Sequence, residues 1–173
     1  MTDDLLVVRE MLERDCPVIS AAFSAQGWYK PVGQYLHYWR ESVEGKRLVL
    51  LAEFDRQFGG YLTIVWESDY PPFRAAGIPE IVDFNVLIRF RRRKIGTSLM
   101  DQAEKRVALR STVVGLGVCL HADYGAAQML YARRGYVPDG RGIYYHGHYP
   151  KHGEQIIIDD DAALYLTKRV RQD

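Results

Sequence analysis

The spacing of apolar residues along the chain predicts a mixture of strands and helices. Short apolar runs indicate strands over 5–10, 46–54, 58–68, 79–88, 112–120, 140–149 and 161–170. Apolar residues at helical spacing indicate helices that follow Asp15, cover 36–43, begin near Lys94 and cover 124–134. The segments 27–33 and 68–77 are expected to be loops. This order predicts one α/β domain over residues 1–173, built around a mixed sheet.

Helix faces and helix ends can also be assigned from the pattern. The helix that begins near Lys94 has one apolar stripe, which consists of Ile95, Leu99, Ala103 and Val107. Asp15 and Asp123 are expected to cap the helices that follow them. Gly135 is expected to end the helix over 124–134, because glycine readily adopts the left-handed conformation found there.

Composition narrows the classes of protein to which the chain can belong. It has 173 residues with 23 Lys and Arg against 22 Asp and Glu, so its net charge of +1 argues against a general nucleic-acid binder. Its two cysteines, Cys16 and Cys119, predict neither a disulfide framework nor a cysteine-based zinc site. No apolar run reaches the ~18 residues of a membrane span, and the acidic start is unlike a signal peptide. We therefore expect a cytoplasmic protein without membrane or nucleic-acid partners.

The stretch from Arg89 to Lys94 concentrates five basic residues at a strand-to-helix junction. The helix that follows has no Ser, Thr, Asp or Asn at its start, so its first N–H groups are free for an external acceptor. Gly96 lets a ligand approach the backbone closely. These features predict an anion site for a phosphate or diphosphate, although a solvated basic turn would give the same pattern. The Walker and dinucleotide-binding glycine patterns are absent.

Three features resemble the GNAT superfamily of N-acetyltransferases. Arg91 and Gly96 match the first and last places of its [Q/R]-x-x-G-x-[G/A] signature, whereas Lys94 stands where the first glycine is usual. The segment "LYARRGY", which begins at Leu130, is similar to the family's "LYxxxGF". The order of the predicted elements fits the family over nearly the whole chain.

The resemblance implies a fold, a co-substrate and a set of binding residues. The fold would be the GNAT-like acyl-CoA N-acyltransferase fold, an α/β (α+β) arrangement whose fourth and fifth strands splay apart around acetyl-CoA. The pantetheine arm would pair with backbone of the fourth strand at Phe84, Asn85 and Val86. The diphosphate would lie on the backbone and side chains of Arg91, Arg92, Arg93, Lys94, Ile95, Gly96 and Thr97. A longer acyl-CoA stays open as the donor.

Acetyl transfer to an amine requires a base and an acid. An alkyl amine has a pKa near 10, so a base must remove a proton before attack. The resemblance implies that Tyr131 protonates the leaving thiolate, and the alternative is that it only packs in the core. Glu80 is expected to be the base, with His121 in reserve. Asp83 is three residues from Glu80 and should face the other side of the strand unless a bulge intervenes. That alternation places Glu80 on the side of Phe84 and Val86.

The remaining alternatives are open at the level of sequence. His146, His148 and His152 cluster in a loop-like segment, and no metal site is expected there. Aromatic residues could line an acceptor pocket or belong to a core or interface, and they are Trp28, Tyr29, Tyr144 and Tyr145. The acceptor is a small-molecule or protein amine, a homodimer stays open, and the alternative function is a non-catalytic acyl-CoA sensor.

Overall fold

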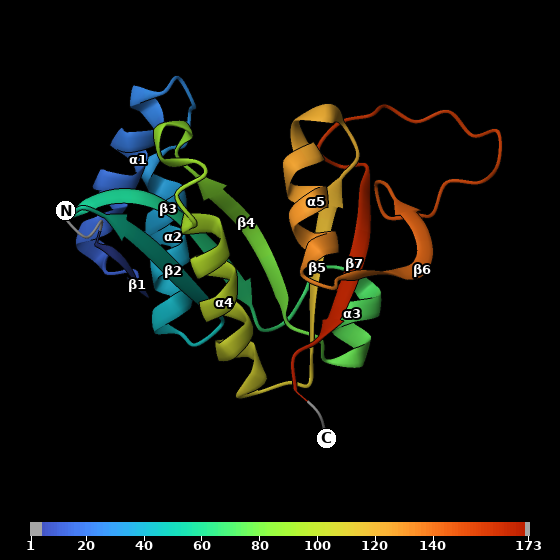
Figure 1. Cartoon of the computed structure of the whole chain (residues 1–173). Helices are drawn as coiled ribbons and strands as arrows, with labels where there is room; N and C mark the ends of the chain where they lie inside the picture. Colours follow the sequence, from blue (N-terminus) through green and yellow to red (C-terminus); the bar gives the residue numbers. More distant parts are fainter. Residues whose placement is uncertain (1–4, 172–173) are drawn as a thin grey trace.

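The computed structural model describes residues 5–171, and seven strands in this range form one mixed sheet (Figure 1). The strand order is β1-β2-β3-β4-β5-β7-β6; β4 and β5 pair in parallel, and the other neighbours are antiparallel. The strands are β1 (Leu6–Glu10), β2 (Arg47–Phe54), β3 (Gln57–Val65), β4 (Glu80–Val86), β5 (Val113–Cys119), β6 (Val137–Tyr144) and β7 (Ala163–Arg169).

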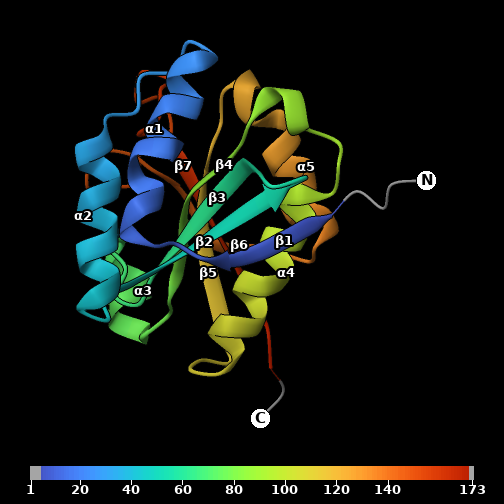
Figure 2. The same cartoon turned by 90° about the vertical axis from the view of Figure 1, so that its left-hand side faces the viewer.

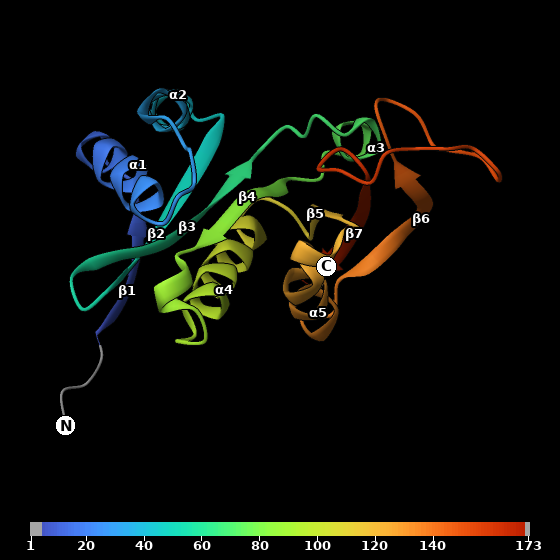
Figure 3. The ribbon, with the colours of Figure 1, turned by 90° about the horizontal axis from the view of Figure 1, so that it is seen from above.

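Helices cover both faces of the sheet, as the two turned views show (Figures 2 and 3). One face carries α1 (Cys16–Ala25), α2 (Val32–Val43) and α3 (Pro71–Ala76), and the other carries α4 (Ile95–Ala108) and α5 (Gly125–Arg133). The described residues also include three short 3-10 helices: η1 (Glu13–Asp15), η2 (Ile88–Phe90) and η3 (Ala122–Tyr124). The predicted mixed α/β architecture is therefore confirmed.

Each face of the sheet has its own apolar core. On the α4 side, the predicted stripe of α4 is buried against the sheet, and its members are Ile95, Leu99, Ala103 and Val107. On the other side, Phe23 of α1 and Tyr35 of α2 pack against β2 and β3. Both cores include residues of β2 and β3, which bury both of their faces. Near-continuous apolar strands such as "LVLL" are typical of this arrangement.

The segment 68–77 was expected to be a loop, and this prediction is wrong because it contains α3. Proline is tolerated in the first turn of a helix, where its missing N–H has no partner to lose. Pro71 occupies that place, and Gly77 ends the helix in the left-handed conformation with φ 63°. The two prolines and the glycine that suggested a loop are thus the two ends of one short helix.

Two expected helix caps are also wrong. The Asp15 carboxylate accepts two hydrogen bonds from Arg9 and one from the Leu12 amide, so it does not cap α1. Asp123 lies inside η3, which the sequence did not predict, and α5 begins two residues later without a side-chain cap. Gly135 does follow α5 with φ 85°, as expected.

The strand β6 is shifted toward the N-terminus relative to the prediction, whereas β7 lies within its predicted range of 161–170. β6 spans Val137–Tyr144 instead of 140–149. The strand ends there because His146 and Gly147 both have positive φ, which turns the chain back. Tyr145 and His148 then form an isolated bridge.

β4 and β5 pair only briefly, and this creates the feature around which the candidate site is built. Their parallel register consists of Glu80 with Gly115 and Ile81 with Leu116. Beyond these residues the two strands diverge, as Figure 1 shows between the labels β4 and β5. The backbone groups of β4 that face β5 past Ile81 therefore lack a strand partner in this register.

Candidate functional site

The start of α4 presents unpaired backbone donors. Lys94 precedes the helix in the left-handed conformation with φ 61°, and its side chain makes no capping hydrogen bond. Within residues 5–171, the amides of Ile95, Gly96 and Thr97 have no protein acceptor, and the first bond of the helix runs from the Ser98 amide to the Lys94 carbonyl. The predicted uncapped helix start is confirmed, and it favours an anion.

Exposed cationic side chains surround this helix start. The residues are Arg89, Arg91, Arg92, Arg93 and Lys94. Three of the guanidinium groups lie over aromatic rings: Arg89 over Phe90, Arg91 over Trp28 and Arg93 over Phe54. Stacking on a ring holds a guanidinium in place above that ring.

Gly96 permits close packing as well as close access to the backbone. A Cβ atom at this position would lie 3.1 Å from Cζ of Phe84 on β4. The glycine therefore lets the first turn of α4 sit directly on the ring of a residue expected to bind the pantetheine arm. The sequence argument found the glycine but not the ring that faces it.

Glu80 is a buried carboxylic acid at the point where β4 and β5 separate. It is 6% exposed, and its Oε2 accepts a hydrogen bond of 2.5 Å from the Ser68 hydroxyl. Burial raises the pKa of Glu80 to about 7, the Ser68 hydrogen bond opposes this rise, and the charge of Asp69 adds to it. A carboxyl with this pKa can exchange a proton near neutral pH.

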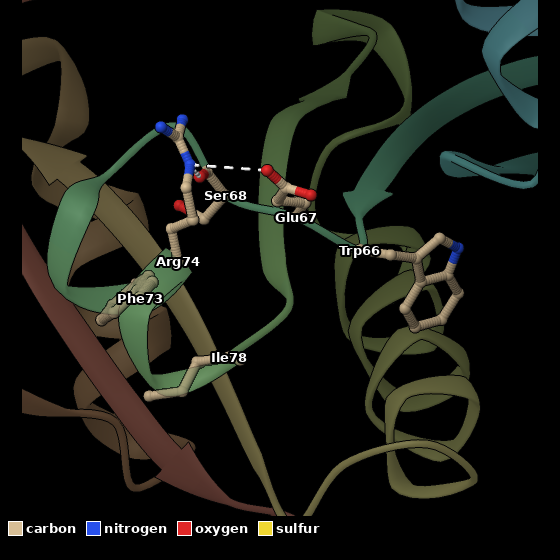
Figure 4. A pocket seen from close by; sticks show the side chains of 7 residues that line it. Trp66, Glu67, Ser68, Phe73, Arg74 and Ile78 are labelled. Carbon is tan, nitrogen blue, oxygen red and sulfur yellow. Dashed lines mark hydrogen bonds and ion pairs between the residues drawn. The ribbon is translucent and has the colours of Figure 1, made fainter.

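Ser68 connects Glu80 to a cavity on the α3 side of the sheet. Its hydroxyl also accepts a hydrogen bond from the Tyr70 amide, which fixes its orientation. Ser68 lines a cavity of about 380 Å³ together with Trp66 and Phe73 (Figure 4). Arg74, at the rim, pairs with Glu67. Ser68 was not predicted from the sequence, because its segment was expected to be a plain loop.

A bulge between Glu80 and Asp83 interrupts the alternation of side chains between the two faces of the sheet. The expectation that Glu80 lies on the same side as Phe84 is therefore wrong. The pairing of β3 with β4 shifts between Tyr61 and Thr63, and Asp83 has a positive φ of 49°. Phe84 joins Ile81 in the core on the α4 side, whereas Glu80 contacts the segment before α3 on the other side. Glu80 and Asp83 therefore face the same side of the sheet, opposite to Phe84.

Asp83 is the centre of a polar network that the sequence did not predict. Its Oδ2 accepts hydrogen bonds from the hydroxyls of Tyr61 (2.5 Å) and Tyr38 (3.0 Å) and from the Gln34 amide (3.0 Å). Its Oδ1 accepts from the Asn85 amide at 2.7 Å and from the Lys30 ammonium at 3.2 Å. Burial raises the pKa of the Tyr38 hydroxyl to about 12, and the charge of Asp83 adds to this rise.

Tyr131 lies on α5 and faces the core on the α4 side of the sheet. It is 6% exposed, and burial raises the pKa of its hydroxyl to about 12, with a smaller contribution from the charge of Cys119. It therefore stays protonated at neutral pH and can donate a proton or a hydrogen bond. Tyr131 belongs to the same apolar core as Leu116 and Val118 of β5, so it packs against the strand that diverges from β4.

His121 is held by carboxylates after the end of β5. Its Nε2 lies 3.0 Å from Asp160, and its Nδ1 lies 3.7 Å from Asp123. Its ring also packs edge-on against Tyr124. These contacts link His121 to the β6–β7 connection, whereas Glu80 contacts the segment before α3.

The aromatic and histidine residues singled out in the sequence are dispersed. Trp28 stacks on Phe23, Tyr29 is 88% exposed, and Tyr144 packs edge-on against Tyr70. His148 pairs with Glu154. His146 lies near two carboxylates at the surface. A ring nitrogen of His146 and one carboxylate oxygen each of Asp159 and Asp161 all lie within 4.8 Å of one another. The expectation that no metal binds there stays untested.

The family model described as "Acetyltransferase (GNAT) family" matches residues 7–136. Among solved structures, a GNAT-family protein from Desulfovibrio desulfuricans has a TM-score of 0.72 at 12% identity, over 96% of this chain and 100% of its own. YncA from Salmonella typhimurium, solved with its cofactor acetyl-CoA, has a TM-score of 0.69 at 14% identity, over 97% and 95%. The ribosomal-protein-S18-alanine N-acetyltransferase from Escherichia coli has 0.69 at 12%, over 98% and 96%.

These similarities are of two kinds. At identities this low the structural matches establish the fold, and the family model adds the sequence pattern. No curated protein is significantly similar in sequence to this chain. Within residues 5–171, no helix is both long and apolar enough to cross a bilayer.

Proposed function

The chain belongs to the GNAT family of acetyltransferases, and we propose that it transfers the acetyl group of acetyl-CoA to a primary amine by direct attack on the thioester. The observation that carries the proposal is Glu80, a buried carboxyl with a pKa of about 7 at the point where β4 and β5 separate. Residues 1–173 would form a single N-acetyltransferase domain.

The residues at the β4–α4 junction fit a coenzyme A molecule. A diphosphate needs N–H donors and positive charge, and the free amides of α4 lie among exposed arginines. A pantetheine arm carries amides that pair with a free strand edge, and β4 has one past Ile81. The bound acetyl-CoA in YncA supports the same co-substrate here. The proposed binding residues are those expected from the sequence, 84–86 and 91–97.

The chemistry then divides between two side chains. Glu80, in its charged form, accepts the proton of the acceptor amine, directly or through water, and the neutral nitrogen attacks the thioester carbonyl. The carbonyl oxygen becomes negatively charged, and a free backbone N–H of β4 can stabilise it. As the carbon–sulfur bond breaks, Tyr131 gives its proton to the coenzyme A thiolate, and the second proton that the nitrogen loses on becoming an amide returns through water to the Tyr131 oxygen. The products are an N-acetylated amine and coenzyme A.

Replacing Gly96 by valine should weaken acetyl-CoA binding at least about tenfold, or ~1.4 kcal/mol. The added methyl groups would displace the Phe84 ring, which already lies 3.1 Å from the Cβ position, and would obstruct the amides of the first turn. Isothermal titration calorimetry with acetyl-CoA measures the effect.

Gly125→Val is the matched control for this substitution. Gly125 begins α5, has a helical φ of −55°, and has no atom within 4 Å of its Cβ position apart from its own neighbourhood in the chain. We expect this variant to bind acetyl-CoA like the wild type. Wild-type affinity in a folded Gly96→Val protein would remove the helix start from the proposed binding site.

A panel of primary amines, assayed for coenzyme A release, tests the proposed activity as a whole. We expect turnover of at least one class of small amine or peptide amine that depends on both acetyl-CoA and Glu80. The bacterial N-acetyltransferase that acts on ribosomal protein S18 supports including peptides with a free N-terminus. Tight acetyl-CoA binding without turnover across the panel would instead favour a non-catalytic acyl-CoA sensor.

A further inference from the structure

The ammonium of Lys30 is enclosed by one carboxylate and two aromatic rings. Its Nζ lies 3.2 Å from Oδ1 of Asp83, 5.5 Å from the ring centre of Phe23 and 5.8 Å from that of Tyr61. The same nitrogen lies 3.3 Å from the Tyr61 hydroxyl. A carboxylate combined with ring faces is the chemistry that proteins use to recognise an alkylammonium. We call Asp83, Phe23 and Tyr61 the ammonium box.

The Asp83 carboxylate of the ammonium box has hydrogen-bond partners other than Lys30. Four neutral donors orient the Asp83 carboxylate, and the shorter of these bonds come from Tyr61 at 2.5 Å and Asn85 at 2.7 Å. The two polar contacts of Lys30 are longer, and it enters from the connection between α1 and α2. Its side chain is 19% exposed and that of Asp83 is 21% exposed, so solvent reaches both. A ligand ammonium could therefore exchange with Lys30.

The bulge in β4 places the ammonium box on the same side of the sheet as Glu80. Asp83 lies three positions after Glu80, which corresponds to roughly 10 Å along a strand at 3.3 Å per residue. A carboxylate in contact with an amine favours the charged form of that amine, and a charged amine cannot attack a thioester. The box is therefore suited to an ammonium group that does not react, while Glu80 deprotonates another.

We propose that the ammonium box binds the second, non-reacting ammonium of an acceptor that carries two amino groups, and that Lys30 fills the box until this acceptor arrives. The inference rests on the proposed function for the role of Glu80, but the binding of an ammonium to the box does not require catalysis. The substrate class is a linear diamine or polyamine.

Binding is tested first, by calorimetry with 1,6-diaminohexane in the absence of acetyl-CoA. We expect Asp83→Asn to weaken the affinity at least about tenfold, since a hydrogen-bonded charge partner is lost. Lys30→Met should tighten it about tenfold if Lys30 fills the box nine-tenths of the time, because the internal competitor is gone. Lys30→Met leaves the carboxylate and its neutral donors in place, so it tests the box even if Asp83→Asn fails to fold.

Turnover is tested second, with 6-aminohexan-1-ol as the matched acceptor. This molecule has the same chain length and a hydroxyl in place of the second amine. We expect the wild type to prefer the diamine at least about tenfold in kcat/KM and Asp83→Asn to lose the preference. If no amine is acetylated, the proposed function fails, and the calorimetry still decides the binding of ammonium.

Three results would overturn the inference. One is equal use of the two acceptors by the wild type while turnover is normal. Another is weaker diamine binding in Lys30→Met, which would make Lys30 a support of the site instead of its occupant. The third is acetylation of Lys30 itself, found by mass spectrometry after incubation with acetyl-CoA, because Lys30 would then be an acceptor.

Discussion

Replacing Glu80 by glutamine is expected to lower kcat at pH 7 by about 10²–10⁴-fold, the usual contribution of a general base. Glutamine keeps the size of the side chain and can still accept the Ser68 hydrogen bond, but it cannot take a proton. The loss should shrink at high pH, where free amine becomes abundant. A pH profile of kcat measures both effects, and in the wild type activity should rise as the pH passes about 7.

Two further variants separate the base from its surroundings. Ser68→Ala removes the hydrogen bond that opposes the raised pKa of Glu80, so the wild-type rise in activity should move to higher pH without being abolished. His121→Asn should keep the wild-type profile, because His121 contacts Asp160 and Asp123. If the profile changes in His121→Asn and not in Glu80→Gln, His121 is the base. Wild-type profiles in both variants would assign the proton to solvent or to the substrate.

The raised pKa of Glu80 also predicts an effect on stability. The folded protein binds this proton more tightly than the unfolded chain, since the pKa rises from 4.5 to about 7. The contribution of Glu80 to the free energy of unfolding is therefore fully present below about pH 4.5, falls as the pH rises, and levels off above about 7. The total is on the order of 3 kcal/mol for this shift. Glu80→Gln should accordingly be more stable than the wild type at pH 8 and similar at pH 4.5, as measured by urea unfolding.

The sequence predicted what depends on local periodicity. The stripe of α4 from Ile95 to Val107 is buried because its spacing matches the helix, and the start of α4 is uncapped because no capping residue precedes it. Both properties depend only on residues that are close together in the sequence. The strand β2 (Arg47–Phe54) matches the predicted range 46–54 for the same reason.

Features that depend on contacts between distant segments could not be predicted. The bulge places Asp83 in hydrogen bonds with Lys30, Gln34 and Tyr38, and it reversed the expected relation between Glu80 and Phe84. Asp15 accepts hydrogen bonds from Arg9 instead of capping α1. Ser68 had no signal at all, because its role comes from a partner 12 residues away on a strand. The residues of the candidate site that were not predicted are mainly those that such contacts bring together, such as Ser68 and the partners of Asp83.

Replacing Tyr131 by phenylalanine should lower kcat by about 10²–10⁴-fold and leave acetyl-CoA affinity nearly unchanged. The substitution keeps the ring in the core and removes only the hydroxyl, whose pKa of about 12 keeps it protonated for donation. Initial rates of coenzyme A release at saturating substrate give kcat, and calorimetry gives the affinity for acetyl-CoA.

Tyr136→Phe is the matched control, because Tyr136 lies in the same core with its ring centre 5.9 Å from that of Tyr131. Its hydroxyl donates a hydrogen bond to Glu104, away from the divergence of β4 and β5, so its loss should change stability more than kcat. A general acid is needed only while the thiolate leaves, and an acyl-CoA analogue with a more acidic thiol should therefore recover part of the Tyr131→Phe loss. A kcat within twofold of wild type in a folded Tyr131→Phe protein would assign Tyr131 to packing, and the leaving thiolate would then take its proton from water.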